Sequence, residues 1–161
     1  MTIEIGNKLK QLNAMLSELD NIYQSLLKVH GVSESEYAVM FTIKELGEGC
    51  NQKDIADSSY ISKKTINSTV KKLEKDGILK LKAAKYPNME IFLTDKGRCF
   101  IEKNIIPIIQ VENKVLENMS DNEFEFLTTY YRIYIKGFKT HVDNYIKNKK
   151  SMEKKEIVKC R

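Results

Sequence analysis

The sequence has 161 residues, which suffices for one domain with helical extensions but not for two full domains. It is 42% hydrophobic and 30% charged, a composition typical of globular rather than disordered proteins. The chain has no run of about eighteen apolar residues, and no apolar stretch follows its first residues, so we expect no membrane span, no secretory signal and a cytoplasmic location. The three cysteines, Cys50, Cys99 and Cys160, lack metal-ligand spacing and are expected to be free thiols.

The net charge of +5 is unevenly distributed along the chain. Residues 51–98 carry 11 Lys/Arg against 6 Asp/Glu, residues 147–161 carry 7 against 2, and the other two segments are mildly acidic. A concentrated basic segment in a near-neutral chain indicates a face that binds a polyanion. On charge alone, a solvated lysine-rich surface explains the pattern equally well.

Capping signals and apolar spacing predict four helices in the first half. Residues 5–26 carry apolar side chains every three or four positions, which indicates a helix with a heptad seam. Gly31 ends this helix, and Ser33 with Glu36 forms a capping box for a second helix that ends at Leu46.

The third and fourth helices are shorter and follow one another closely. Asn51 is expected to cap a helix over residues 52–58, and a brief turn follows. Ser62 is expected to cap the fourth helix, residues 63–76, which Gly77 closes.

After this helix the apolar period changes from about 3.6 to 2. The alternation over residues 79–83 and 89–93, with a Pro-Asn turn between them, predicts a β-hairpin. A fifth helix is expected over residues 95–119 with a bend at Pro107, because proline lacks the backbone donor. A sixth helix, capped by Ser120, should reach residue 147.

The fourth helix carries the pattern that points to function. Ile66, Val70 and Leu73 share one face, so the helical period places lysines and short polar side chains on the other. Lysines neutralise phosphates, short amides and hydroxyls reach base edges, and the positive helix N-terminus favours phosphate. The candidate DNA-binding residues, including two on the hairpin, are Lys53, Ser62, Lys63, Lys64, Thr65, Asn67, Ser68, Lys71, Lys72, Lys75, Lys82 and Lys85.

Residues 52–97 resemble the winged helix-turn-helix of the MarR family of bacterial transcriptional regulators. The resemblance depends on I-A-x-x-x-x-I-S-x-x-T at residues 55–65, V-x-x-L-E-x-x-G-I-L at 70–79 and L-T-x-x-G at 93–97. It implies a mainly α fold with a small β-hairpin wing, in which N- and C-terminal helices make a homodimer. The implied partner is a pseudo-palindromic DNA operator, with the fourth helix in the major groove and the wing in the minor groove.

The expected organisation follows from this resemblance and from the helix pattern. It comprises an N-terminal dimerisation helix (1–32), a winged helix-turn-helix (33–97), C-terminal dimerisation helices (98–147) and an unstructured basic tail (148–161). One departure concerns the wing tip, where family members usually carry an arginine and this chain offers only Lys82 and Lys85. We therefore expect the wing to attract phosphates but to add little sequence discrimination.

The sequence also offers candidate residues for binding an effector or sensing an oxidant. Relatives bind aromatic acids or lipophilic compounds in a crevice, which Tyr23, Tyr37 and Phe41 would line here, although such aromatics are more often core residues. Other relatives sense oxidants, and Cys50 precedes a helix beside a lysine, as a lowered thiol pKa would require. Neither of the two histidines has a ligand cluster beside it, so no metal or cofactor is expected.

The leading interpretation is a dimeric, sequence-specific DNA-binding repressor modulated by a small molecule or an oxidant. The alternative is a winged-helix adaptor that binds proteins and has little affinity for DNA, which the wing without arginine would suit. An enzyme is not expected, because no nucleophile elbow, P-loop, zinc-protease or dinucleotide-binding motif is present.

Overall fold

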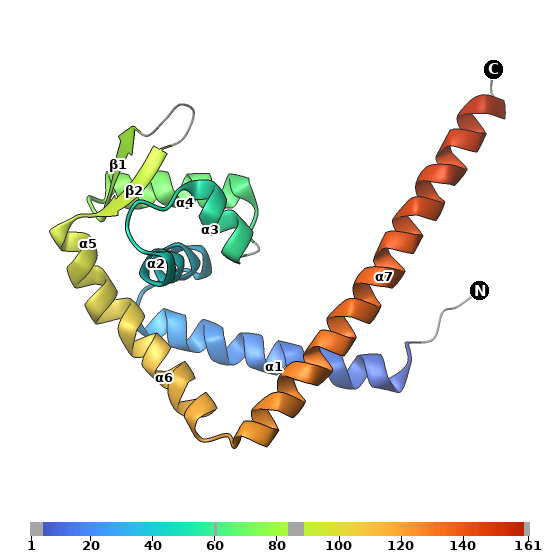
Figure 1. Ribbon diagram of the computed structural model, residues 1–161, viewed down its shortest axis with the longest axis horizontal. Helices are drawn as coiled ribbons and strands as arrows, with labels where there is room; N and C mark the ends of the chain where they lie inside the picture. The colour runs from blue at the N-terminus through green and yellow to red at the C-terminus, as the bar shows by residue number, and fades with distance from the viewer. Residues whose placement is uncertain (1–4, 60, 84–88, 160–161) are drawn as a thin grey trace. The chain divides into compact units, whose positions relative to one another are not determined.

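The computed structural model describes residues 5–59, 61–83 and 89–159 (Figure 1). The described chain is mainly helical with one two-stranded hairpin, which confirms the expected fold class. The elements in chain order are α1 (Asn7–Val29), α2 (Glu34–Leu46), α3 (Gln52–Ser59), α4 (Lys63–Lys75), β1 (Leu79–Ala83), β2 (Met89–Leu93), α5 (Asp95–Phe100), the π-helical turn η1 (Ile101–Ile105), α6 (Ile106–Glu117) and α7 (Asp121–Lys159). None of these helices is apolar over a length that would cross a membrane.

Local capping explains where the helices of the first half begin. The Ser33 hydroxyl accepts from the backbone N–H of Glu36, and the Glu36 carboxylate accepts from the backbone N–H of Ser33, at 2.9 Å. The Ser62 hydroxyl accepts from a backbone N–H in the first turn of α4 at 3.1 Å, and Asn51 caps α3 in the same way. These contacts span two or three residues, and the boundaries that the sequence predicted from them are confirmed.

A hydrophobic core joins α2, α3, α4 and the hairpin. The inner face of α4 is completely buried, with Ile66, Val70 and Leu73 each 0% exposed. The remaining members include Val39, Met40, Ile43, Ile55, Leu79, Ile91 and Leu93. Burial of one aliphatic face therefore fixes how α4 is rotated and leaves its polar face outside.

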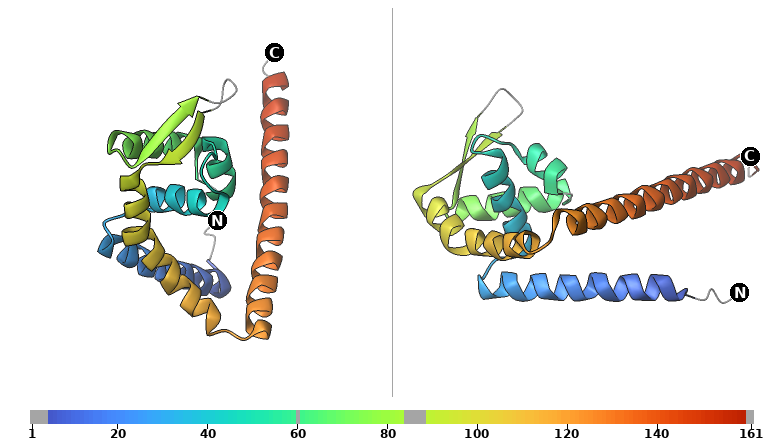
Figure 2. Two further views of the ribbon diagram at one scale, coloured as in Figure 1. Left: turned by 60° about the vertical axis from the view of Figure 1, so that its left-hand side comes forward. Right: turned by 60° about the horizontal axis from the view of Figure 1, so that its bottom comes forward.

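The hairpin is antiparallel and lies beside α4 (Figures 1 and 2). Leu79 pairs with Leu93 at its base. A third segment adds to this sheet: the Gly49 N–H donates to the Ile91 carbonyl at 2.8 Å, and the Ile91 N–H donates to the Cys50 carbonyl at 2.9 Å. The sequence did not predict this edge, because the five residues between α2 and α3 are too few to show a strand period.

The L-T-x-x-G motif fastens the hairpin base to the start of α5. The Thr94 hydroxyl donates to the Gly77 carbonyl at 2.6 Å and accepts from the Gly97 N–H at 3.0 Å. A Cβ on Gly97 would lie 2.1 Å from the Ile78 carbonyl oxygen, so only glycine permits this close approach. The motif thereby holds the wing in place relative to the helix that follows it.

The fifth predicted helix differs from the observed one. In place of a single helix bent at Pro107, the structure has α5, the π turn η1 and then α6. The Ile106 N–H bonds to the Ile101 carbonyl, five residues back. A proline ring clashes with the carbonyl four residues before it, and the wider turn just ahead of Pro107 accommodates the ring.

The chain divides into two compact units, residues 1–112 and 113–161. In the second unit, Ser120 and Glu123 form the capping box of α7. The helix continues to Lys159, whereas the sequence pattern predicted an unstructured tail from residue 148. Residues 138–159 contain no glycine or proline and are rich in strong helix formers, which outweighs the lack of an apolar pattern.

Candidate nucleic-acid interface

The outer face of α4 is open. It exposes the candidate DNA-binding side chains of Lys63, Lys64, Thr65, Asn67, Ser68, Lys71, Lys72 and Lys75. These side chains are therefore exposed to solvent, and four of the five lysines make no ion pair with any described residue.

Three of the predicted hydroxyl side chains already have local partners. The Ser62 and Thr65 hydroxyls lie 2.8 Å apart within the cap of α4, and the Ser68 hydroxyl donates to the Thr65 carbonyl at 2.8 Å. The Asn67 amide has no hydrogen-bond partner among the described residues and lies one turn into the helix. An asparagine amide can bond to adenine through both its donor and its acceptor, so Asn67 is the strongest candidate for reading a base.

Lys72 is held by the protein itself. Its ammonium lies 2.7 Å from the carboxylate of Glu36, which is 8% exposed and also caps α2. Burial raises the pKa of the Glu36 carboxyl, but hydrogen bonds from Lys72 and Ser33 outweigh this effect and lower it. The pair joins α4 to α2, so the structure gives Lys72 a partner other than the DNA phosphate that the sequence suggested.

The remaining basic candidates lie on either side of α4. Lys53 is exposed at the start of α3. Lys82 is exposed on β1, and its ammonium lies 4.6 Å from the centre of the Phe92 ring, a cation–π arrangement. The predicted wing-tip contact of Lys85 lies outside the described residues.

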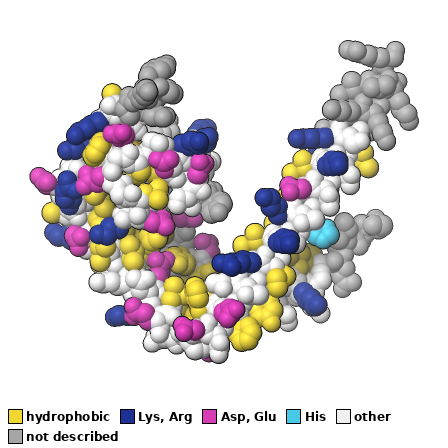
Figure 3. Space-filling view, viewed as in Figure 1, with side chains coloured by type: hydrophobic (Ala, Val, Ile, Leu, Met, Phe, Trp, Pro, Cys, Tyr) yellow, Lys and Arg dark blue, Asp and Glu magenta, His cyan; other side chains and the backbone are white. Residues whose placement is uncertain are grey.

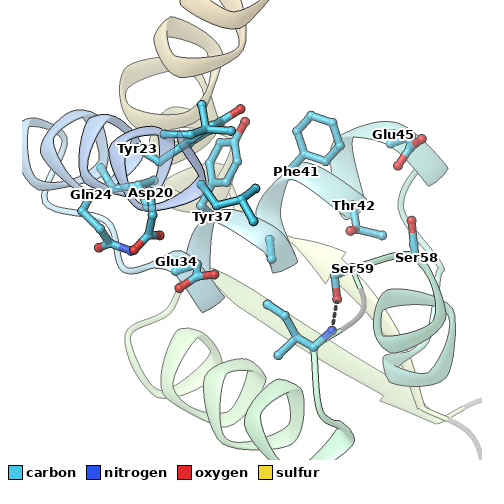
Figure 4. A pocket seen from close by; sticks show the side chains of 15 residues that line it. Asp20, Tyr23, Gln24, Glu34, Tyr37, Phe41, Thr42, Glu45, Ser58 and Ser59 are labelled. Atoms are coloured by element: carbon cyan, nitrogen blue, oxygen red, sulfur yellow. Dashed lines mark hydrogen bonds between the residues drawn. The ribbon is translucent and has the colours of Figure 1, made fainter. Parts of the chain in front are cut away.

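A pocket of about 600 Å³ lies beside α1 and α2 (Figure 4). It brings together Tyr23, Tyr37 and Phe41, the three aromatics that the sequence suggested for an effector crevice. The Tyr37 and Phe41 ring centres are 5.7 Å apart. The other lining residues are Leu16, Leu19, Asp20, Gln24, Leu27, Glu34, Ala38, Thr42, Glu45, Ser58, Ser59 and Ile61.

Two tyrosines of this pocket, Tyr23 and Tyr37, share the carboxylate of Glu112. The Tyr37 hydroxyl donates to one oxygen of Glu112 at 2.8 Å, and the Tyr23 hydroxyl donates to the other. Burial, with the adjacent Glu112 charge, raises the pKa of Tyr23 to about 12 and also raises the pKa of Tyr37. Sequence reasoning missed Glu112, because it lies 75 and 89 positions from its partners and nothing local marks it.

Cys50 does not have the environment of a redox sensor. Its side chain is buried, and burial together with the nearby Asp54 carboxylate raises the pKa of the thiol. The sequence had suggested a lowered pKa from the helix start and a neighbouring lysine. The structure shows the opposite direction, which disfavours the reactive thiolate that sensing requires.

Comparison with known proteins identifies a family match and several structures of similar fold. Residues 32–82 match the MarR family model. No curated protein matches the sequence. Among solved structures, the MarR family regulator NMB1585 from Neisseria meningitidis is similar, with 17% identity, a TM-score of 0.75 and coverage of 86% of this chain and 99% of that chain.

Two further structures come from Streptomyces coelicolor. Sco3205, a MarR family transcriptional regulator solved in complex with DNA, has 15% identity, a TM-score of 0.67 and coverage of 85% and 91% of the two chains. The PcaV transcriptional regulator, solved with its natural ligand, has 15% identity, a TM-score of 0.66 and coverage of 83% and 98%. The family match and the shared fold confirm the resemblance to MarR family transcriptional regulators.

Proposed function

We propose, from the MarR family domain at residues 32–82, that this chain is a homodimeric DNA-binding regulator that recognises a specific operator sequence and acts as a repressor. In this proposal α4 enters the major groove, the hairpin follows the adjacent backbone, and a small molecule in the aromatic pocket changes the affinity for DNA.

The single observation that carries the proposal is the division of α4 into two faces. Its aliphatic face is fully buried, while its lysines and the Asn67 amide face outward. Free lysines at Lys64, Lys71 and Lys75 supply phosphate contacts, and Asn67 supplies a base contact. Sco3205, which has the same fold, was solved in complex with DNA, and this supports DNA as the partner in the proposal.

The dimer is proposed from the apolar side chains that the terminal helices leave exposed. In α7 these side chains recur every three or four residues, and Figure 3 shows hydrophobic side chains along this helix. They include Phe124, Leu127, Tyr131, Tyr134, Phe138 and Tyr145. A symmetric dimer would present two α4 helices to half-sites one turn apart, roughly 34 Å, which requires a pseudo-palindromic operator.

Fragments of genomic DNA selected by the purified protein provide the test. Fluorescence anisotropy then compares the selected operator with a scrambled duplex of the same length and composition. In the dimer, Asn67→Ala removes one base contact from each half-site, so it is expected to reduce operator affinity by at least about thirtyfold while leaving affinity for the scrambled duplex nearly unchanged. Lys64→Ala serves as the matched control and should weaken both duplexes alike.

Two results would contradict the proposal. If Asn67→Ala weakens both duplexes equally, the amide does not read a base. If the parent protein binds neither duplex even at low salt, the adaptor alternative is favoured.

A further inference from the structure

The charge of the aromatic pocket restricts the ligands that it accepts. Three carboxylates line it, Asp20 on α1 and Glu34 and Glu45 on α2, and none makes an ion pair with a described residue. The described lining residues include no lysine, arginine or histidine. In the view of Figure 4, Asp20 and Glu34 lie on one side of the aromatic rings and Glu45 on the other. An anionic ligand would meet like charge on both sides.

Three hydroxyls of the pocket already donate within the protein, which leaves only the neutral side chains of Gln24, Thr42 and Ser58 to donate to a ligand. The hydroxyls of Tyr23 and Tyr37 are both committed to Glu112. The Ser59 hydroxyl donates to the Ile55 carbonyl at 2.7 Å. A carboxylate ligand would meet only neutral donors there, and it would gain no positive charge to offset the loss of its hydration.

A cationic ligand would be attracted by the same features that disfavour an anion. The faces of the Tyr37 and Phe41 rings attract positive charge, and the surrounding carboxylates add to this attraction. The negative charge of Glu112, whose carboxylate accepts from both tyrosine hydroxyls, contributes to their raised pKa values. The leucines of α1 supply apolar surface for the rest of a ligand.

We propose that the pocket binds a small lipophilic or aromatic cation, an amine or an onium compound, rather than an aromatic acid. This inference rests on the effector role proposed above and narrows it to one chemical class. A pocket of about 600 Å³ lies within the range that holds drug-sized ligands.

The test uses two probes of the same shape and opposite charge. Isothermal titration calorimetry of the full-length protein measures binding of tetraphenylphosphonium and of tetraphenylborate in low-salt buffer. We expect the phosphonium to bind at least about tenfold more tightly than the borate, because only the sign of the charge differs. The net charge of +5 favours the borate elsewhere on the surface, so a preference for the cation would be specific to the pocket.

Matched variants locate the site. The variant Asp20→Asn/Glu34→Gln/Glu45→Gln should lose about tenfold in phosphonium affinity. The control Glu18→Gln/Asp57→Asn/Glu74→Gln removes the same charge from exposed positions outside the pocket and should change the affinity less than about twofold. Circular dichroism checks that both variants remain folded.

The outcomes separate this inference from the proposed function. The inference is overturned if the borate binds as tightly as the phosphonium, if neither probe binds, or if both triple variants respond alike. DNA binding is measured in parallel by anisotropy. Retained DNA binding without cation binding refutes only the ligand class, whereas cation binding by a protein that binds no DNA refutes only the regulator.

Discussion

Two adjacent lysines of α4, Lys71 and Lys72, should have different roles. The sequence presents them as equivalent basic residues on one helix. In the structure Lys71 is exposed and makes no ion pair with a described residue, whereas Lys72 is paired with the buried carboxylate of Glu36 at 2.7 Å. We therefore expect Lys71→Ala to reduce DNA affinity and Lys72→Ala to reduce mainly the stability of the fold.

The expected magnitude follows from counterion release. Each lysine–phosphate contact contributes about 0.9 to the slope of log K against log salt concentration. A dimer with two α4 helices would lose two contacts in Lys71→Ala, so its slope should decrease by about 1.8. If the variant and the parent have equal affinities near 1 M salt, affinity at 0.1 M falls about 60-fold.

Lys72→Ala should behave differently in the same anisotropy titrations. Its salt slope should match that of the parent, while its midpoint of urea unfolding should be lower. The pair holds the pKa of Glu36 below the ordinary value of 4.5, so its stabilisation is present above that pH and is lost as pH falls through the lowered pKa. The stability difference between parent and variant should therefore disappear in strong acid.

The result that refutes this reasoning is specific. If Lys72→Ala lowers the salt slope as much as Lys71→Ala does, and its urea midpoint is unchanged, then Glu36 does not hold the side chain away from DNA in solution.

Three further predictions concern the packing and chemistry around the interface. Gly97→Ala should lower the free energy of unfolding by about 1–3 kcal/mol in urea titrations, because its methyl group would collide with the Ile78 carbonyl; an unchanged midpoint would contradict the close approach. Absorbance at 295 nm should show Tyr23 still protonated at pH 11, since its pKa is about 12, and its bond to Glu112 should be lost only as pH rises through that value; ionisation of all eight tyrosines by pH 11 would exclude this. Iodoacetamide labelling read by mass spectrometry should modify the exposed Cys99 well before the buried Cys50, and the reverse order would restore the redox hypothesis.

Several features of this protein were predictable from the sequence because they depend on short-range interactions. Ser33, Asn51 and Ser62 each cap a helix through contacts within three residues. The same holds for the inner face of α4 and for the hairpin, which follow from apolar periods of 3.6 and 2. The resemblance at residues 55–65, 70–79 and 93–97 supplied the family on the same local basis.

Other features were decided only by the tertiary structure. Lys72 pairs with Glu36, which is 36 residues away in the sequence. Tyr37 and Tyr23 bond to Glu112, which is 75 and 89 residues away, and the backbone of Gly49 bonds to a strand some forty residues away. Each contact depends on how helices pack, and periodicity specifies which face is buried but not which distant side chain it meets. The negative charge of the pocket and the burial of Cys50 also depend on tertiary structure, because both result from residues that are distant in the sequence and come together only in the folded chain.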